Sequence, residues 1–167
     1  MNQQTIIWGG FCLLVLAAAL IWPRPTRRFL GGFFIVMALG VNLVFVLVNP
    51  GGFVGIGTDA PLLGFYEWAF STIVVISPIA FGIALATYEL ALGTCMIIGG
   101  RPARWGLLAG IVFLVASTPL STWTLPNLVL AVALLVILRR EPVGDQRETR
   151  RNRKRRALPA ADAVLQG

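Results

Sequence analysis

Five apolar stretches, separated by short polar segments, constrain this chain more than any other feature of its sequence. A helix needs about 20 apolar residues to cross the hydrocarbon core of a bilayer, because that core is about 30 Å thick and each residue adds about 1.5 Å. The stretches reach this length, the last two with their flanking residues, and lie at about 5–22, 29–48, 73–98, 105–121 and 123–138. The sequence therefore predicts an all-α membrane protein, with a five-span transmembrane helical bundle over residues 1–138.

Composition supports this class and argues against a self-contained active site. Hydrophobic residues make up 57% of the 167 residues, more than a water-soluble domain of this length can bury. The chain has no histidine, which removes the commonest metal ligand and general base. Its two cysteines, Cys12 and Cys95, lie in separate apolar stretches, and no P-loop, nucleophile elbow or paired-cysteine motif is present. We therefore expect no catalytic residue, no metal site and no enzyme activity from the chain on its own.

The placement of the arginines indicates the orientation of the spans. Five arginines lie between the first and second stretches or between the third and fourth: Arg24, Arg27, Arg28, Arg101 and Arg104. The connections 49–72 and 120–124 contain no Lys or Arg. Because basic connections stay in the cytoplasm, we expect the N-terminus outside and the C-terminus in the cytoplasm. The first helix lacks a basic leader and a small-residue cleavage site, so we expect it to be retained.

Two segments outside the spans have their own character. The outer connection 49–72 is too apolar for an ordinary loop, and Tyr66 and Trp68 suit the headgroup level, so it is predicted to hold an interfacial helix. Residues 139–167 form a basic tail that we expect to be disordered, because nothing in it can bury a core. Directly after a span, such a tail favours anionic lipid of the inner leaflet over nucleic acid. The predicted headgroup contacts are Arg150, Arg151, Arg153, Lys154, Arg155 and Arg156.

Glu89 is the strongest candidate for a functional residue. It lies within the third stretch, and no Lys or Arg lies in any span to pair with it. An ionised carboxylate is costly in a bilayer, so Glu89 is protonated, hydrogen-bonded to neutral groups or in contact with water. It is a candidate to bind a ligand or exchange a proton, and the alternative is a neutral acid that joins two helices.

Three other polar side chains are candidate partners of Glu89. Tyr88 precedes it, and Asn42 and Asn127 lie in the second and fifth stretches. Because buried amides require hydrogen-bond partners, these residues are predicted to line one polar pocket with Glu89, open to the outside. Separate interhelical hydrogen bonds are the alternative, which Pro126 favours for Asn127 because it marks a helix start there.

Small residues predict how two of the helices pack. Gly82, Ala86 and Gly93 share a helical face with Glu89, and Gly106 and Gly110 have similar spacing in the fourth stretch. Small residues at every fourth position let helix backbones approach closely. We therefore predict that the third and fourth spans form an antiparallel hairpin, with Glu89 in or beside the seam.

Three segments in the second half of the chain follow a known pattern. The first is Tyr88-Glu89-Leu90-Ala91-Leu92-Gly93, which is similar to a Glu-Leu-x-x-Gly motif. The other two are the turn Gly99-Gly100-Arg101 and the pair Pro126-Asn127 at the start of the last span. With these segments, residues 79–140 resemble the DoxX family of small bacterial membrane proteins. The resemblance implies a four-helix unit made of spans two to five, with the first helix as an addition. It places Glu89 at the family's in-membrane acid position and implies a link to quinone-reducing or thiol and oxidative-stress complexes.

Three functional hypotheses follow. The preferred one is a DoxX-like subunit of a membrane-associated redox complex, with a Glu89-centred pocket for a quinone or similar lipophilic ligand. Its expected partners are a redox protein and further copies of the chain in a homo-oligomer. A quinone is the one candidate cofactor. The second hypothesis is a small transporter or channel subunit, with a polar path lined by Glu89, Asn42 and Asn127. The third is a structural membrane anchor without a ligand.

Overall fold

The computed structural model describes residues 3–140, which form a bundle of helices without a strand. The α-helices are α1 (Gln3–Ile21), α2 (Pro23–Val36), α3 (Leu43–Val48), α4 (Pro50–Thr58), α5 (Gly64–Thr72), α6 (Pro78–Ile98), α7 (Gly100–Ser117) and α8 (Asn127–Arg140). A π-helical segment, η1 (Met37–Asn42), joins α2 to α3, and three short 3₁₀ turns are η2 (Val74–Ile76), η3 (Thr118–Leu120) and η4 (Thr122–Thr124). The predicted headgroup contacts at 150–156 lie outside the described residues.

Five helical segments are long and apolar enough to cross a membrane, which agrees with the predicted class. They are Gln3–Ile21, Pro23–Val48, Pro78–Ile98, Gly100–Leu120 and Thr122–Arg140. The second of these is continuous through α2, η1 and α3. The chain is therefore a multi-pass helical membrane protein.

The helix boundaries differ from the prediction at the two basic connections. α2 begins at Pro23 and α7 at Gly100, so the first five arginines lie in the opening turns of helices instead of in loops. Proline suits the first helical position, because its φ is already helical and its missing N–H has no partner there. Gly99 makes the sharp turn between α6 and α7 with φ 84°, a conformation that favours glycine.

The third span starts later than predicted, and the outer connection before it also differs from the prediction. The span begins at Pro78 instead of at residue 73, because η2 and a non-helical Ser77 separate α5 from α6. The outer connection holds two short helices, α4 and α5, where the sequence predicted one. Arg139 and Arg140, which were assigned to the tail, belong to the last turn of α8.

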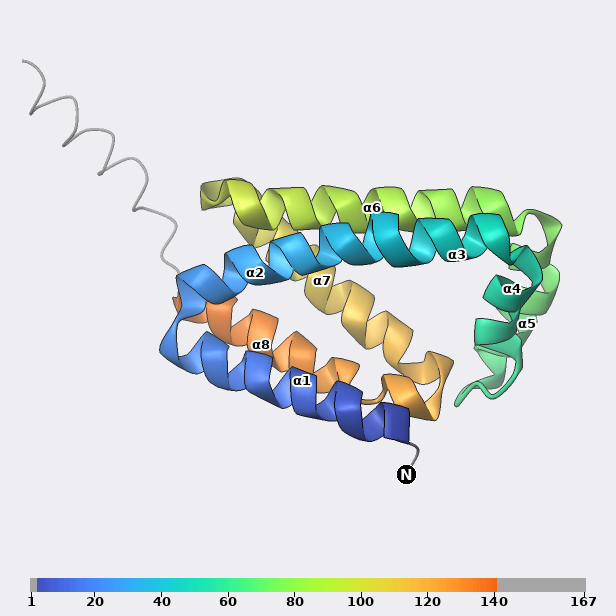
Figure 1. Cartoon of the computed structure of the whole chain (residues 1–167), viewed down its shortest axis with the longest axis horizontal. Helices are drawn as coiled ribbons and strands as arrows, with labels where there is room; N and C mark the ends of the chain where they lie inside the picture. The colour runs from blue at the N-terminus through green and yellow to red at the C-terminus, as the bar shows by residue number, and fades with distance from the viewer. Residues whose placement is uncertain (1–2, 141–167) are drawn as a thin grey trace, which may run out of the picture.

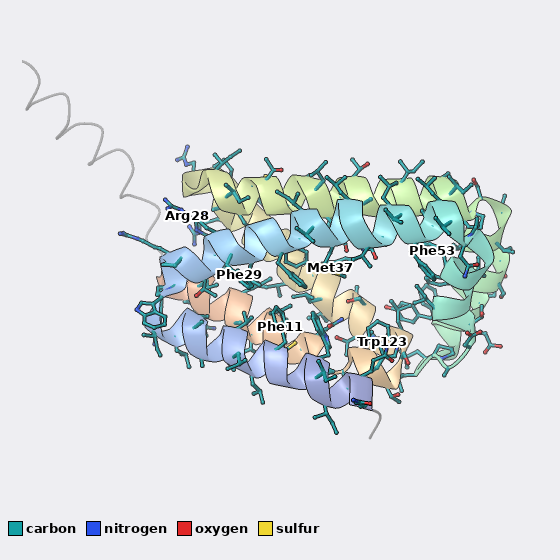
Figure 2. The ribbon with its side chains drawn as sticks, in the orientation of Figure 1. Phe11, Arg28, Phe29, Met37, Phe53 and Trp123 are labelled. Carbon is teal, nitrogen blue, oxygen red and sulfur yellow. The ribbon has the colours of Figure 1, made fainter. Side chains whose placement is uncertain are left out.

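The five long helices form a closed ring in which α2 packs against α6, α6 against α7, α7 against α8, α8 against α1 and α1 against α2. Figure 1 shows that the α1–α8 pair and the α2–α6 pair diverge from the end where α1 meets α2, and that α4 and α5 stand at the wide end. All seven arginines of the described residues lie at the narrow end, in the helix ends of α2, α7 and α8. Arg28 there is labelled in Figure 2. The first helix, expected as an addition, is an integral member of the ring.

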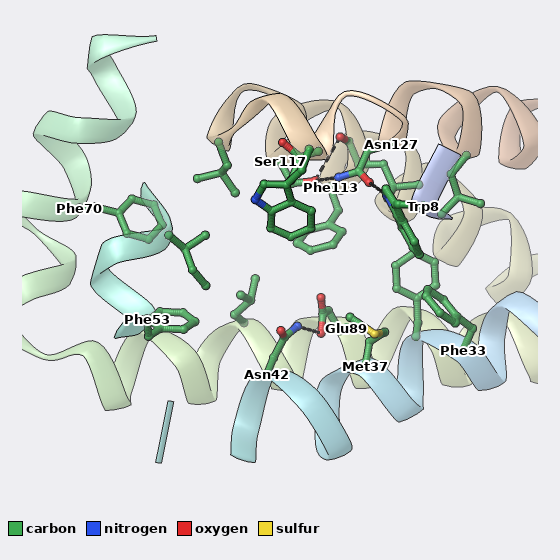
Figure 3. Close-up of a pocket in the computed structure, with 18 residues that line it drawn as sticks. Trp8, Phe33, Met37, Asn42, Phe53, Phe70, Glu89, Phe113, Ser117 and Asn127 are labelled. Atoms are coloured by element: carbon green, nitrogen blue, oxygen red, sulfur yellow. Dashed lines mark hydrogen bonds between the residues drawn. The ribbon is translucent and has the colours of Figure 1, made fainter. Parts of the chain in front are cut away.

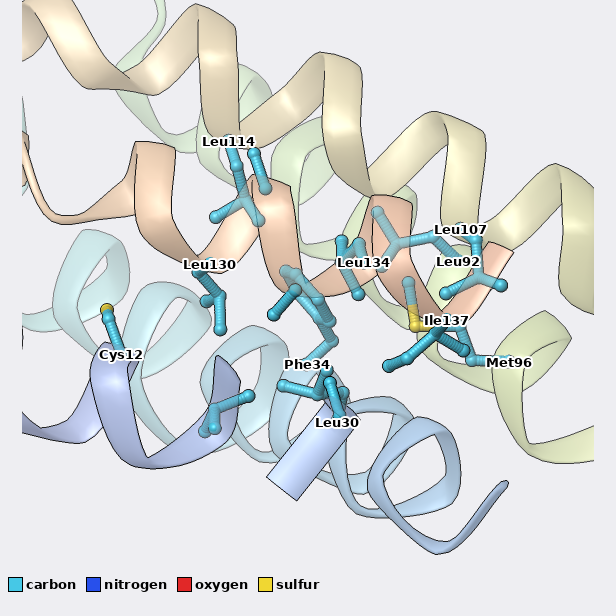
Figure 4. Close-up of a cluster of buried hydrophobic side chains, with 14 residues drawn as sticks. Cys12, Leu30, Phe34, Leu92, Met96, Leu107, Leu114, Leu130, Leu134 and Ile137 are labelled. Carbon is cyan, nitrogen blue, oxygen red and sulfur yellow. The ribbon is translucent and has the colours of Figure 1, made fainter. Parts of the chain in front are cut away.

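The buried apolar side chains form two clusters. The larger one fills the bundle toward the narrow end and includes Leu30, Phe34, Met96 and Leu134 (Figure 4). The smaller one lies beneath the α4–α5 cap and consists of Val46, Phe53, Phe70 and Val74. A cavity lies between the two clusters, because residues of both line its walls.

The small residues of α6 pack against a different partner from the one predicted. A Cβ added to Gly93 would lie 2.6 Å from the Gly31 carbonyl oxygen of α2, and one added to Gly82 would lie 2.6 Å from the Val46 side chain of α3. The face that carries Gly82, Ala86, Glu89 and Gly93 therefore meets the second span. α6 and α7 are neighbours as expected, with Gly106 of α7 against the Leu92 carbonyl of α6, and Gly110 meets Leu134 of α8 and Met96.

Candidate functional site

The cavity at the wide end of the bundle has a volume of about 180 Å³. Most of its lining is aliphatic or aromatic, and its aromatic members come from α1, α2, α4, α5, α7 and η4: Trp8, Phe33, Phe34, Phe53, Phe70, Phe113 and Trp123. Cavities that bind small molecules are usually of this kind, mostly apolar with a few polar groups that fix orientation. The polar groups here stand on two facing walls (Figure 3).

The first wall carries Glu89 of α6 and Asn42 of η1. Glu89 is only 2% exposed, and the Asn42 Nδ2 donates a hydrogen bond of 2.6 Å to its Oε2. No described group bonds to Oε1, and Figure 3 shows the carboxyl group directed into the cavity. Glu89 is therefore held by one neutral amide and presents its second oxygen to the cavity.

The π-helical segment places Asn42 on this wall. Residues five apart in an α-helix point about 140° away from one another around the axis. A π-turn bonds residues five apart and stacks them on one face, so Met37 and Asn42 both line the cavity. A regular helix through 37–42 would turn one of these two side chains away from the cavity.

The facing wall carries Asn127 at the start of α8. The Trp8 Nε1 donates to the Asn127 Oδ1 at 2.9 Å, and the Asn127 Nδ2 donates to the Ser117 Oγ at 3.0 Å. An asparagine amide has two N–H donors, so one N–H of Asn127 is left over after these two bonds. Asn127 is 7% exposed, and its orientation is fixed by helices α1 and α7 together.

Three of the four predicted site residues meet in this cavity, and one does not. Glu89, Asn42 and Asn127 all line it. Tyr88 was predicted to line it too, but it is 39% exposed and its hydroxyl donates to the Ala109 carbonyl of α7 at 2.8 Å. Adjacent residues of a helix point about 100° apart, so Tyr88 joins α6 to α7 outside the cavity.

Sequence reasoning missed the two hydrogen-bond partners of Asn127 in the site, Trp8 and Ser117. The sequence patterns considered above single out neither residue. One signal for Trp8 exists in the sequence, since a buried indole N–H requires an acceptor. Nothing in the sequence shows that the acceptor is Asn127, 119 positions away.

The fold and the cavity define a multi-pass helical membrane protein with one buried acid and one buried amide on opposite walls of an apolar chamber. No protein-family model, no curated protein and no solved structure matches the chain.

Proposed function

We propose that the chain is a DoxX-like integral membrane subunit whose cavity binds the ring of a quinone or a similar lipophilic ligand. In this proposal it lies in the inner membrane of a bacterium, with its N-terminus outside, and works with a redox protein that supplies or accepts electrons. The observation that carries the proposal is the position of Glu89, which is buried in the bundle with one oxygen bonded to Asn42 and the other open to the cavity.

The size of the cavity suits one six-membered ring. An engineered apolar cavity of about 150 Å³ is large enough to bind benzene, and the cavity here is about 180 Å³. Five phenylalanine and two tryptophan side chains line it, and such side chains stack on a planar ring.

The polar groups suit a ring with two acceptors on opposite sides. A protonated Glu89 donates from Oε1, because Oε2 already accepts from Asn42. The remaining N–H of Asn127 is a second donor on the facing wall. The two carbonyl oxygens of a quinone lie at opposite ends of its ring and would accept from both walls. Glu89 would hold or release a proton at Oε1 as the bound ligand changes its protonation, and the electrons would pass to or from the partner.

The same features favour ligand binding over a conducting path. A path for ions or polar solutes needs polar groups in series along it. The polar groups here instead face each other across an apolar chamber. The anchor hypothesis explains the bond between Asn42 and Glu89. It does not explain why the second carboxyl oxygen faces an open chamber.

Fluorescence titration of the purified chain in nanodiscs tests the proposal. The probe is the tailless ubiquinone head group, because quinones quench indole fluorescence and Trp8 and Trp123 line the cavity. We expect saturable quenching, weakened about 10-fold or more in Glu89→Leu, as expected for the loss of about 1.4 kcal/mol of binding free energy. Glu67→Leu, which removes an exposed acid of α5, is the matched control and should bind as the parent chain does.

Two further variants separate the hypotheses. Trp8→Phe/Trp123→Phe should abolish most of the saturable quenching, although three other tryptophans remain. Glu89→Gln keeps a hydrogen-bond donor, so it should bind the ring but lose activity with the redox partner. Equal affinity of Glu89→Leu and the parent chain would refute the proposal, and uptake of a solute by the chain alone in proteoliposomes would favour a transporter.

A further inference from the structure

A second apolar space adjoins the cavity on the outer surface of the bundle. It is a groove of about 680 Å³ between α1 and the start of α8, lined by Thr5, Gly9, Leu13, Leu125 and Val129 among others. Apart from threonine hydroxyls, the groove has no polar side chain, and α1 and α8 are both membrane-spanning segments.

The cavity and the groove share one thin wall. Residues of the two spaces alternate along the chain: Trp8 faces the cavity and Gly9 the groove, while Trp123 and Asn127 face the cavity and Pro126 the groove. Trp123 is 41% exposed although it lines the cavity. The Trp123 side chain therefore extends from the cavity to the molecular surface, and its neighbour in sequence, Thr122, lines the groove.

We propose that the ligand of the cavity carries a long hydrocarbon tail, and that this tail leaves past Trp123 and lies in the groove between α1 and α8. This inference rests on the proposed binding of the ring at Glu89. Thr5 and Leu13 are eight positions apart, which makes the groove about 12 Å long, close to the length of a decyl chain. The ligand class is thus a ring with a prenyl or alkyl chain, in preference to a small aromatic molecule.

Two neighbouring glycines provide a matched test. An added Cβ at Gly9 would lie 3.7 Å from Pro126 within the groove, whereas nothing lies within 4 Å of one at Gly10. Gly9→Leu therefore fills the groove, and Gly10→Leu adds the same side chain to an open part of α1. Leu13→Phe and Leu14→Phe are a second pair, because Leu13 lines this groove and Leu14 lines a different one, between α1 and α2.

The experiment compares the tailless ubiquinone head group with its decyl-tailed analogue in nanodiscs of one lipid composition. We expect Gly9→Leu and Leu13→Phe to weaken binding of the decyl analogue about fivefold or more, because the tail loses its packing contacts. The same variants should leave the tailless ring unaffected. Gly10→Leu and Leu14→Phe should bind both probes as the parent chain does.

The outcomes separate the two proposals. If the tailless ring binds through Glu89 but Gly9→Leu and Leu13→Phe leave the decyl analogue unaffected, the tail does not use the groove and this inference is wrong. If neither probe binds the parent chain, the proposed function itself fails. A third outcome has two parts: Glu89→Leu does not weaken binding of the tailless ring, and the groove variants weaken binding of the decyl analogue equally with and without Glu89→Leu. The groove would then be a site for membrane acyl chains that is not linked to the cavity.

Discussion

Replacing Gly31 of α2 by alanine should separate the two membrane-spanning segments that carry Glu89 and Asn42. A Cβ at this position would lie 2.7 Å from the Gly93 carbonyl oxygen and 2.8 Å from the Ile97 side chain. Ordinary van der Waals contact begins at 3.4 Å, so α2 and α6 would have to part by about 0.7 Å. The oxygen belongs to the backbone of α6, so no rotamer change can relieve this clash.

The size of the effect follows from packing. A gap of about 0.5–1 Å removes a quarter to a half of the dispersion energy of the contacts it opens, and helices in a bilayer associate largely through such contacts. Overpacking of this kind costs about 1–3 kcal/mol. Alanine recovers up to about 1 kcal/mol of helix propensity relative to glycine, so the net destabilisation should be about 1–2 kcal/mol.

Gly32 provides the control within the same turn of helix. Nothing lies within 4 Å of a Cβ added there, so Gly32→Ala should gain helix propensity without a clash. Thermal unfolding of both variants, followed by circular dichroism in one detergent, should place Gly31→Ala several degrees below Gly32→Ala, as expected for a difference of about 2 kcal/mol. Equal melting temperatures would show that the close approach of α2 and α6 contributes nothing to stability.

Two further predictions concern the cap and the second wall of the cavity. Gly57→Ala would place a Cβ 2.2 Å from the Phe70 ring, so it should destabilise the α4–α5 cap by about 1–3 kcal/mol and speed proteolysis between the two helices. Gly51→Ala is the control and should not speed proteolysis, because nothing lies within 4 Å of a Cβ added there. Asn127→Leu removes the acceptor of the Trp8 indole and should lower the free energy of unfolding by about 1–3 kcal/mol, measured by chemical denaturation. Unchanged proteolysis or unchanged unfolding would contradict the respective prediction.

The partners of the small residues show why part of the fold could not be predicted. The spacing of Gly82, Ala86 and Gly93 identifies a face that a helix backbone approaches closely, because that depends on side-chain size alone. It does not specify which helix approaches. The fourth span is adjacent in sequence, but the second span occupies the face, with Gly31 against Gly93 and Val46 against Gly82.

The candidate site, too, was only partly predictable from the sequence. Glu89, Asn42 and Asn127 were identifiable because polar side chains are costly in an apolar span wherever they point. Tyr88 was misplaced, because a neighbour in sequence points about 100° away around a helix. The π-turn that brings Asn42 onto the cavity wall has no marker in Met37–Asn42.

The sequence alone determined that this chain has five segments long and apolar enough to cross a membrane as helices, because the required length and composition are local properties set by the thickness of the bilayer. It also identified Glu89, Asn42 and Asn127 as polar side chains that need partners inside the bundle. The tertiary structure decided that Asn42 holds Glu89, that Asn127 faces them with Trp8 and Ser117, and that an apolar chamber lies between the two walls. These pairings join residues up to 119 positions apart. They depend on the splay of the ring of helices, which arises only when all five pack together.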